Sequence, residues 1–498
     1  MSSLSDSFGA LARSAAIVFV GTVLGRILSL LGEVVIIRSL APEAFGTVAL
    51  AYTVVLTVTR IGILGVPDGV SRMLSDETIG SRERHFLTGG YVIVLGSGAV
   101  IATLLYLFGD ALGTLMNEPQ LSDLVVLFVP FVFLFPLAMV SIAVLRARKR
   151  PLGATLSQHV GARIGAIGVF VAFAYFGRPF VGAVAYWIVT PAFAALLALS
   201  LVSREYSIRS ITTTLPSGDS IRDLWSFSWP LAIRTSLVTL MTNLDVLMIG
   251  FFLESTMVGF YRSVQPLRQV TLFVLQSFVF LFLPLATEYY TRTELDELRE
   301  LYRVSSKWIA LLTLPPVLVF SLFAPDVVRT ILHPEYLPGA AALSVLTAGL
   351  FFNALVGPNG AMLKAVDRPR IEMFAAILGV VTNLALNVAL IPVLGIVGAA
   401  VATVVGYFVF NVAEVVAIYR IVGTHPFSRN SLEPIVVTTL AGLAIALVTG
   451  GTRFSLPELI GIGMLLVAVQ AVAVVLTRSF DEADQVLIEQ AKRRIGLD

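Results

Sequence analysis

Residues 145–151 read LRARKRP, and residues 363–369 read LKAVDRP. Leucine, a basic residue, alanine, arginine and proline recur in these two segments in the same order. A glycine follows each proline at the same distance, Gly177 in the first copy and Gly395 in the second. Ordered correspondences of this kind rarely arise by chance. The sequence therefore predicts a structural unit of about 210 residues that occurs twice.

Two further correspondences extend the repeat. The small-residue runs Gly182-Ala-Val-Ala and Gly398-Ala-Ala-Val follow the two glycines, and EVVIIRSLAPEAFG from Glu33 resembles DVLMIGFFLESTMVG from Asp245. The repeat predicts an N-lobe at 1–215, a C-lobe at 216–425, two additional helices within 426–480 and a cytoplasmic tail at 481–498. In a membrane protein, a duplicated bundle is typical of a transporter whose halves move against each other.

The composition is that of an integral membrane protein. Of the 498 residues, 57% are hydrophobic and 13% are charged, with a mean hydropathy of +0.90. Soluble domains carry about 25% charged residues. The apolar runs are continuous over about 20 residues, which is the length of a helix that crosses the hydrocarbon core. They lack the alternating pattern of a membrane β-barrel, so we expect an all-α membrane protein.

Fourteen apolar segments are long enough to span the membrane. The predicted helices occupy residues 12–37, 46–66, 86–108, 122–145, 152–176, 180–202, 226–252, 258–287, 303–323, 339–363, 371–391, 396–419, 432–450 and 457–477.

The placement of basic residues predicts the orientation. With a cytoplasmic N-terminus, the cytoplasmic segments hold 23 of the 34 lysines and arginines, and the external loops hold five. Basic residues favour the cytoplasmic side, so both termini are predicted to be cytoplasmic. Six helices per repeat make the two copies parallel, with their axis along the membrane normal. The five external residues are Arg38, Arg178, Arg262, Arg329 and Arg453.

The remaining basic residues fall inside predicted spans. Each would cost about 2.5–3.5 kcal/mol at the centre of a lipid-facing helix, so we expect them to face protein or water. Together they predict a cationic cavity for an anionic substrate. Acids inside the spans are fewer, and we consider them charge partners or ion-coupling groups. The basic candidates are Arg26, Arg60, Arg163, Arg234, Arg268 and Lys307, and the acidic ones are Glu33, Asp245 and Glu414.

Structural roles remain open for several of these residues. Arg26 and Glu33 share a helix face and could neutralise each other. Arg163 and Lys307 could extend toward the membrane surface if they lie away from its midplane. Asn411 and Glu414, like Asn383 and Asn387 on the preceding helix, could form interhelical hydrogen bonds or a cation-coupling site.

The sequence has no features of an enzyme or of a nucleic-acid-binding protein. It has no cysteine, P-loop, HExxH or Gly-x-Ser-x-Gly motif, and no histidine has a metal-binding neighbour at helical spacing. We therefore expect no catalytic residue, metal or cofactor. A membrane glycosyltransferase would need acidic clusters on outer loops, where Asp110, Glu118 and Asp123 are sparse.

Four segments resemble the multidrug/oligosaccharidyl-lipid/polysaccharide exporter superfamily, in particular its polysaccharide-transporter branch of oligosaccharide flippases. They are residues 24–51, 62–74 and 225–261 and the helix start at Gly395. The resemblance implies two six-helix lobes forming a V around a central cavity, two further helices and alternating access. It also implies a polyprenyl-phosphate- or pyrophosphate-linked sugar as substrate. In related flippases of lipid-linked peptidoglycan precursors, arginines on helices 1, 2 and 8 hold the phosphates.

Arg26, Arg60 and Arg268 lie on those three helices here. The leading hypothesis is a monomeric flippase of the cytoplasmic membrane that moves a lipid-linked oligosaccharide for surface polysaccharide or glycoprotein glycan assembly. Its partners would be membrane lipids and glycosyltransferases or a glycan polymerase or ligase. The alternatives are a cation-coupled multidrug exporter and a lipid-linked peptidoglycan-precursor flippase of the same superfamily.

Overall fold

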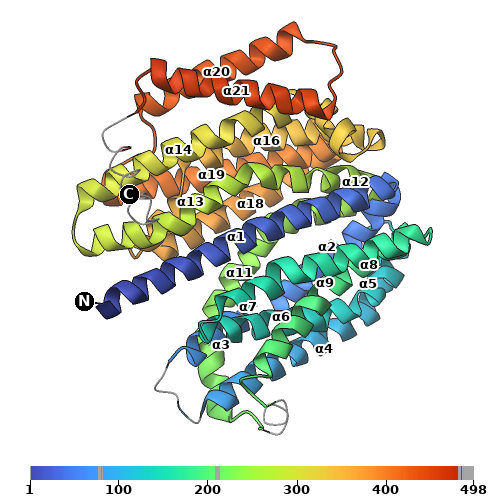
Figure 1. Cartoon of the computed structure of the whole chain (residues 1–498). Helices are drawn as coiled ribbons and strands as arrows, with labels where there is room; N and C mark the ends of the chain where they lie inside the picture. The colour runs from blue at the N-terminus through green and yellow to red at the C-terminus, as the bar shows by residue number, and fades with distance from the viewer. Residues whose placement is uncertain (1, 77–79, 81, 208–213, 481–483, 485–498) are drawn as a thin grey trace. The chain divides into compact units, whose positions relative to one another are not determined.

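A computed structural model describes residues 2–76, 80, 82–207, 214–480 and 484. Every regular element among these residues is helical, which confirms the all-α prediction (Figure 1). Fourteen helical segments are long and apolar enough to cross a membrane, as predicted from the apolar runs. They are Val20–Ser39, Pro42–Gly62, Glu83–Leu115, Gln120–Ala147, Pro151–Tyr175, Pro179–Val202, Gly218–Phe252, Ser255–Thr291, Leu295–Leu322, Pro334–Ala365, Pro369–Leu394, Ile396–Val422, Arg429–Val448 and Leu456–Leu476.

The two copies of the opening heptapeptide adopt the same turn. Lys149 and Asp367 occupy equivalent positions, and their φ angles of 54° and 58° are both left-handed. In each copy the next amide bonds back to the leucine carbonyl, Arg150 to Leu145 at 2.9 Å and Arg368 to Leu363 at 2.8 Å. This 6→1 bond ends a helix as a Schellman motif, and the proline then begins the next helix. The sequence repeat is therefore a structural repeat at this turn.

The chain forms two compact units, Met1–Arg262 and Ser263–Asp498. The predicted lobe boundary at 215/216 follows the sequence repeat rather than compactness, and it stays a prediction. The difference arises at α11 (Gly218–Phe252), which packs against α2 (Pro42–Gly62), α3 (Val66–Leu74) and α4 (Glu83–Leu115) of the first unit. The predicted tail lies outside the described residues except for Asp484.

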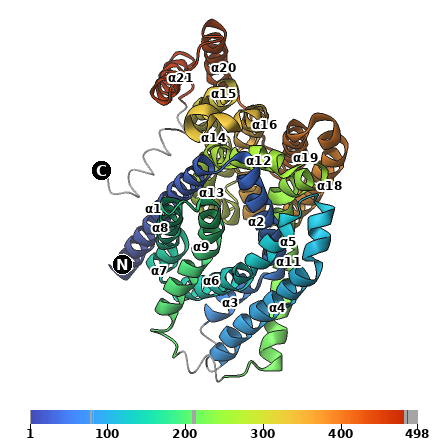
Figure 2. The same cartoon turned by 90° about the vertical axis from the view of Figure 1, so that its right-hand side faces the viewer.

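In the first unit, α6 (Val129–Ala147) packs against α9 (Pro179–Val202), α4 and α3. Buried apolar side chains of these helices form the core, among them Val66, Phe86, Leu145 and Ala198. Helix α1 (Ser2–Ser39) lies along α7 (Pro151–Thr155) and α8 (Ala162–Tyr175) (Figure 2). A π-helical turn, η2 (Leu156–Gly161), joins α7 to α8 and interrupts a segment predicted as one helix.

Basic residues of the first heptapeptide are paired at this end of the unit. Arg148 contacts Glu83 and the Tyr206 hydroxyl, and Arg150 contacts Glu205. These pairs connect the end of α6 to the start of α4 and to the segment after α9. Their charges are balanced locally, as expected for groups that stabilise a turn rather than bind a substrate.

In the second unit, α14 (Leu295–Leu322) packs against α13 (Gln265–Thr291) and α16 (Ala340–Val356). The two extra helices, α20 (Arg429–Val448) and α21 (Leu456–Leu476), pair with each other beside α14 (Figure 1). Helices α18 (Pro369–Leu394) and α19 (Ile396–Val422) form a further packed pair. Buried Phe282, Tyr302, Met362 and Ile418 lie in a core cluster of this unit.

A predicted helix is broken in this unit at Gly357. Its φ of 77° ends α16, and α17 (Asn359–Ala365) begins two residues later. A β-carbon at Gly357 would lie 2.1 Å from the Ser306 hydroxyl oxygen. Glycine satisfies both the positive φ and the close approach of α14.

Backbone contact through two glycines holds α12 (Ser255–Ser263) against the start of α2. A β-carbon on Gly46 would lie 1.8 Å from the Ser255 carbonyl oxygen, and one on Gly259 would lie 2.0 Å from the Pro42 carbonyl oxygen. Small residues permit such close helix approach in membranes. Larger side chains at either position would separate the two helices.

Gly46→Ala should therefore lower the thermal stability of the full-length protein in detergent, at a cost of about 1–3 kcal/mol for overpacking against backbone. The matched control is Gly96→Ala, because a β-carbon there has no atom within 4 Å. Alanine is the better helix former, so the control should melt at or above the wild-type temperature. Equal melting temperatures for the two variants would contradict the contact.

Candidate functional site

The predicted site residues fall into both units. Six of them lie in the first unit and three in the second. The first group contains Arg26, Glu33, Arg60, Arg163, Arg234 and Asp245, and the second contains Arg268, Lys307 and Glu414.

In the first unit, Tyr52 of α2 lies at the centre of a charged region. Arg60, Arg163, Arg262 and Glu33 all lie within Coulombic range of its hydroxyl. The Tyr52 ring stacks on Trp187 of α9, with ring centroids 4.7 Å apart and planes 7° from parallel. Three guanidinium groups and one carboxylate therefore lie near this hydroxyl, so positive charge is in excess.

Glu33 forms an ion pair with Arg262. The Glu33 Oε2 atom lies 3.2 Å from the Arg262 Nη1 atom, and both side chains are largely buried. From the sequence, Arg26 was considered as the partner of Glu33, and Arg262 was assigned to an external loop. Instead Arg262 lies on α12, one turn after Gly259, whose contact with α2 sets the position of this helix.

Arg163 stands at the start of α8, where its Nη1 atom donates to the Tyr186 hydroxyl at 3.4 Å. Gly32 of α1 permits this arrangement, because a β-carbon there would lie 2.7 Å from the same hydroxyl. His159 of the preceding π-helical turn lies within Coulombic range of Arg26 and Arg163. Thus α1 and α8 bring two of the predicted arginines to one region.

Arg60 is exposed near the end of α2. Its guanidinium carbon lies 5.8 Å from the ring centroid of Phe135, a cation–π geometry that leaves hydrogen-bond donors available for other groups. We use the term cationic cluster for Arg26, Arg60, Arg163 and Arg262 together with Glu33. Tyr52, Tyr186, Trp187 and Arg262 were not predicted, because their roles depend on contacts between helices distant in sequence.

Arg234 and Asp245 occupy different environments on α11. Arg234 is exposed, whereas Asp245 is buried and accepts a hydrogen bond of 2.8 Å from the Tyr261 hydroxyl. This bond connects α11 to α12 and stabilises a buried carboxyl group.

Arg268 lies on α13 and is 6% exposed. Its Nε atom has no hydrogen-bond partner within the part of the chain that the structure describes. In the same unit, Glu414 is buried on α19 and lies within Coulombic range of Glu372 and Lys364.

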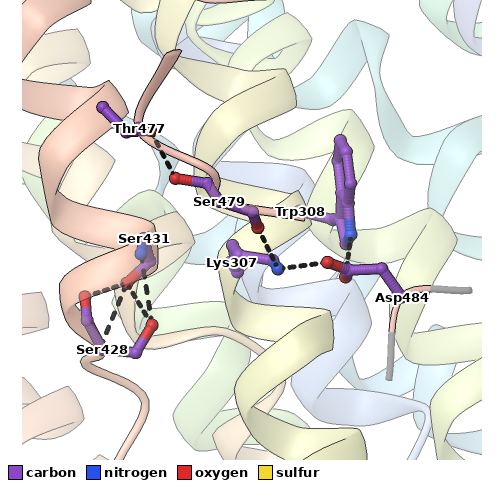
Figure 3. Close-up of polar contacts among 7 residues, drawn as sticks. All are labelled: Lys307, Trp308, Ser428, Ser431, Thr477, Ser479 and Asp484. Atoms are coloured by element: carbon purple, nitrogen blue, oxygen red, sulfur yellow. Dashed lines mark hydrogen bonds and ion pairs between the residues drawn. The ribbon is translucent and has the colours of Figure 1, made fainter. Parts of the chain in front are cut away.

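Lys307 contacts two residues near the C-terminus, Ser479 and Asp484 (Figure 3). Its Nζ atom lies 2.6 Å from Asp484 Oδ2 and donates to the Ser479 carbonyl at 2.9 Å. The second oxygen of Asp484 accepts from the Trp308 indole nitrogen at 2.8 Å. The charge of Lys307 is therefore matched by Asp484, which favours a structural role for this lysine.

Asp484→Ala should destabilise the protein by about 3–5 kcal/mol, because the buried Lys307 ammonium would lose its counter-ion. Thermal melting followed by tryptophan fluorescence tests this, since Trp308 loses its acceptor as well. Lys307→Met combined with Asp484→Leu should restore most of the loss. The control is Glu433→Ala, which breaks the exposed Arg429–Glu433 pair and should change stability by less than about 0.5 kcal/mol. Similar melting temperatures for Asp484→Ala and Glu433→Ala would show that the Lys307–Asp484 pair does not stabilise the protein.

Glu33→Gln should cost about 1.5–3 kcal/mol, the range for hydrogen bonds to charged groups. A double-mutant cycle with Arg262→Met measures the coupling between the two side chains by thermal melting. Glu288→Gln, which breaks the exposed Arg292–Glu288 pair, is the control. Additive effects of the Glu33 and Arg262 substitutions would show that the ion pair does not contribute.

Comparisons with known proteins agree with this fold. The profile of the family described as "Polysaccharide biosynthesis protein" matches residues 11–289, and the MatE profile matches residues 230–389. The probable low-salt glycan biosynthesis flippase Agl15 of Haloferax volcanii is 23% identical over 458 residues, which is 92% of each chain. The probable flippase AglR of the same organism is 26% identical over 195 residues, covering 37% of this chain and 39% of AglR.

Solved structures share the architecture. The lipid II flippase MurJ in its inward closed conformation superposes with a TM-score of 0.73 at 15% identity, covering 92% of this chain and 98% of MurJ. An inward-facing multidrug resistance transporter of the MATE family gives a TM-score of 0.63 at 16% identity, covering 86% and 96%. The chain therefore belongs to the polysaccharide biosynthesis protein family, the oligosaccharide flippase branch of the multidrug/oligosaccharidyl-lipid/polysaccharide exporter superfamily.

Proposed function

We propose that this multi-pass membrane protein moves a polyprenyl-phosphate- or pyrophosphate-linked oligosaccharide across the cytoplasmic membrane by alternating access. The glycan would serve surface polysaccharide or glycoprotein assembly. The observation that carries this proposal is the cationic cluster of the first unit, in which four arginines accompany one glutamate. Both termini would face the cytoplasm, and the protein would act as a monomer.

The chemistry of the cluster suits a phosphate headgroup. A charged headgroup cannot cross about 30 Å of hydrocarbon without a polar path. Guanidinium groups bind phosphate oxygens through paired hydrogen bonds, and they stay charged in partly buried surroundings. Arg60 is exposed, and Arg26 and Arg163 are half-buried, so the cluster has donors at several depths. Flipping a lipid breaks no covalent bond, so the proposal requires no catalytic residue.

The names of the relatives support glycan transport. Agl15 and AglR are both described as probable flippases, and Agl15 is assigned to glycan biosynthesis. Enzymes that build or transfer the glycan, such as glycosyltransferases, a polymerase or a ligase, would then supply the substrate and use the product.

The alternatives make different demands on the same cluster. A multidrug exporter for cationic compounds would place its substrate against an excess of positive charge, which is unfavourable. A peptidoglycan-precursor flippase would use the same phosphate contacts, so the cluster agrees with that substrate equally well. Translocation of defined lipids separates the two.

Arg26→Ala, Arg60→Ala and Arg163→Ala should each slow translocation of a lipid-linked oligosaccharide in proteoliposomes by about 10–100-fold. That range corresponds to loss of a charge-assisted hydrogen bond of about 1.5–3 kcal/mol. Protection of a labelled sugar from a membrane-impermeant reagent gives the rate.

Arg178→Ala is the matched control, because Arg178 is exposed and lies between α8 and α9, outside the cluster. It should transport at the wild-type rate. Wild-type rates in all three cluster variants would overturn the proposed phosphate contacts. Faster movement of a lipid-linked peptide-bearing precursor than of any oligosaccharide would favour the alternative substrate.

A further inference from the structure

Glu414 is a buried acid that the phosphate chemistry of the first unit does not use. Its side chain is 1% exposed, and within the described part of the chain its Oε1 atom has no hydrogen-bond partner. An ionised carboxylate buried without compensation is strongly unfavourable. This oxygen therefore requires a proton, a cation or an ordered water.

A second acid, Glu372, lies near Glu414. A β-carbon placed on Gly360 of α17 would lie 3.6 Å from Glu414 Oε1 and 3.3 Å from Glu372 Oε1. Glycine at this position therefore leaves room for two carboxyl groups to approach each other. Both carboxyl oxygens lie within 3.6 Å of this one point, so two negative charges there would repel each other, and one bound proton would relieve the repulsion.

The charges around the pair are nearly balanced. Lys364 Nζ lies 3.0 Å from Glu372 Oε1. The Asn359 amide hydrogen-bonds Asn411, and both Asn359 and Tyr302 of α14 lie near Glu414. The sequence of α16, which also packs against α19, contains no charged residue. Two acids and one lysine leave one negative charge, and one proton makes the cluster neutral.

The first copy of the repeat shows which residues occupy the positions equivalent to Glu372 and Glu414. Aligned through the heptapeptides, Glu372 corresponds to Ala154, and aligned through the Val-Gly-Ala starts of α9 and α19, Glu414 corresponds to Ala198. Both alanines are buried in the core of the first unit. The same helix arrangement therefore packs in the first unit without either acid. Helix packing thus does not explain the presence of Glu372 and Glu414 in the second unit.

The polar framework around the acids is retained between copies. Ser141 corresponds to Asn359, and its hydroxyl lies 3.0 Å from the Tyr91 hydroxyl. In the second unit, the Tyr302 hydroxyl lies 3.3 Å from Asn359 Oδ1. The tyrosine contact is common to both copies, whereas the two acids are added in the second.

We propose that Glu372 and Glu414 share one exchangeable proton and form a proton-binding site that opens past Lys364. Lys364 is 34% exposed and Glu372 18%, so the site runs from solvent to a buried oxygen. A proton would pass from water to Glu372 and be shared between the two carboxyl groups. That binding of this proton drives substrate movement is a second step, and it rests on the proposed flippase function.

A metal cation is the competing ligand, and the donor set disfavours it. Among the described residues, no group of three or more histidine, aspartate and glutamate side chains is arranged to hold a metal ion. The ammonium group of Lys364 already occupies one oxygen of Glu372. Ca²⁺ takes six to eight oxygen ligands, more than this pair and its amide neighbours offer.

Infrared spectroscopy of the full-length protein in lipid nanodiscs tests the site without any substrate. A protonated-carboxyl band should persist at pH values well above about 4, where exposed glutamates titrate, and Glu414→Gln should remove it. Glu288→Gln removes an exposed, ion-paired carboxyl group on α13 and should leave the band unchanged. A band that survives in Glu414→Gln, or none in the wild type, would overturn the proposal.

Lys364→Met keeps both acids, so it provides a second test that still applies if the Glu414→Gln variant does not fold. Loss of the ammonium group should extend the band to higher pH by about one unit or more, since the remaining negative charge holds the proton more tightly. If the titration midpoint of the carboxyl band is the same in Lys364→Met as in the wild type, the proposal of a shared proton is wrong. A band that Na⁺ displaces at constant pH and ionic strength would also overturn it, because the site would then bind sodium.

Transport in proteoliposomes tests the coupling separately. A proton gradient should accelerate wild-type translocation several-fold, and Glu414→Gln should make the rate independent of that gradient. A gradient-independent wild-type rate would overturn the coupling. If the wild type moves no lipid-linked sugar at all, the proposed function fails, while the infrared titration still decides whether the proton site exists.

Discussion

The high cost of a charge in hydrocarbon is the constraint on which this structure depends. The protein meets it in three ways. Glu33 pairs with Arg262 and Lys307 with Asp484, so both charges of each pair are compensated. Asp245 instead accepts a hydrogen bond from Tyr261. The third way is to leave an excess of one sign that a ligand can balance, and this is the arrangement on which the proposed transport function depends.

The two copies of the repeat share helices and turns but differ in their polar content. Schellman turns at Lys149 and Asp367 show that backbone geometry is retained where sequence identity is partial. Side chains inside the copies have diverged, with arginines on the helices of the first unit and a pair of acids in the second. Duplication thus supplies two similar scaffolds, and substitution of buried positions gives each one its own chemistry.

Sequence could predict the fourteen helices because continuous apolar runs depend on local composition alone. It could also place Arg26, Arg60 and Arg163 inside spans. It could not find the partner of Lys307, because Asp484 lies 177 residues away in a charged tail. Arg262 was assigned to a loop rather than to a helix, and its contact with Glu33 could not be predicted because the position of α12 depends on a glycine contact with α2. The break at Gly357 required knowledge of its positive φ.

The net charge of each buried cluster determines which kind of ligand can neutralise it. Around Tyr52, three arginines and one glutamate leave two positive charges, which a phosphate or pyrophosphate group can neutralise. Around Gly360, two glutamates and one lysine leave one negative charge, which a single proton neutralises. A neutral cluster is cheaper to bury than a charged one, so the proposed ligand of each unit would lower the same electrostatic cost. Under both proposals, the binding energy would come from a charge imbalance that the folded chain maintains without its ligand.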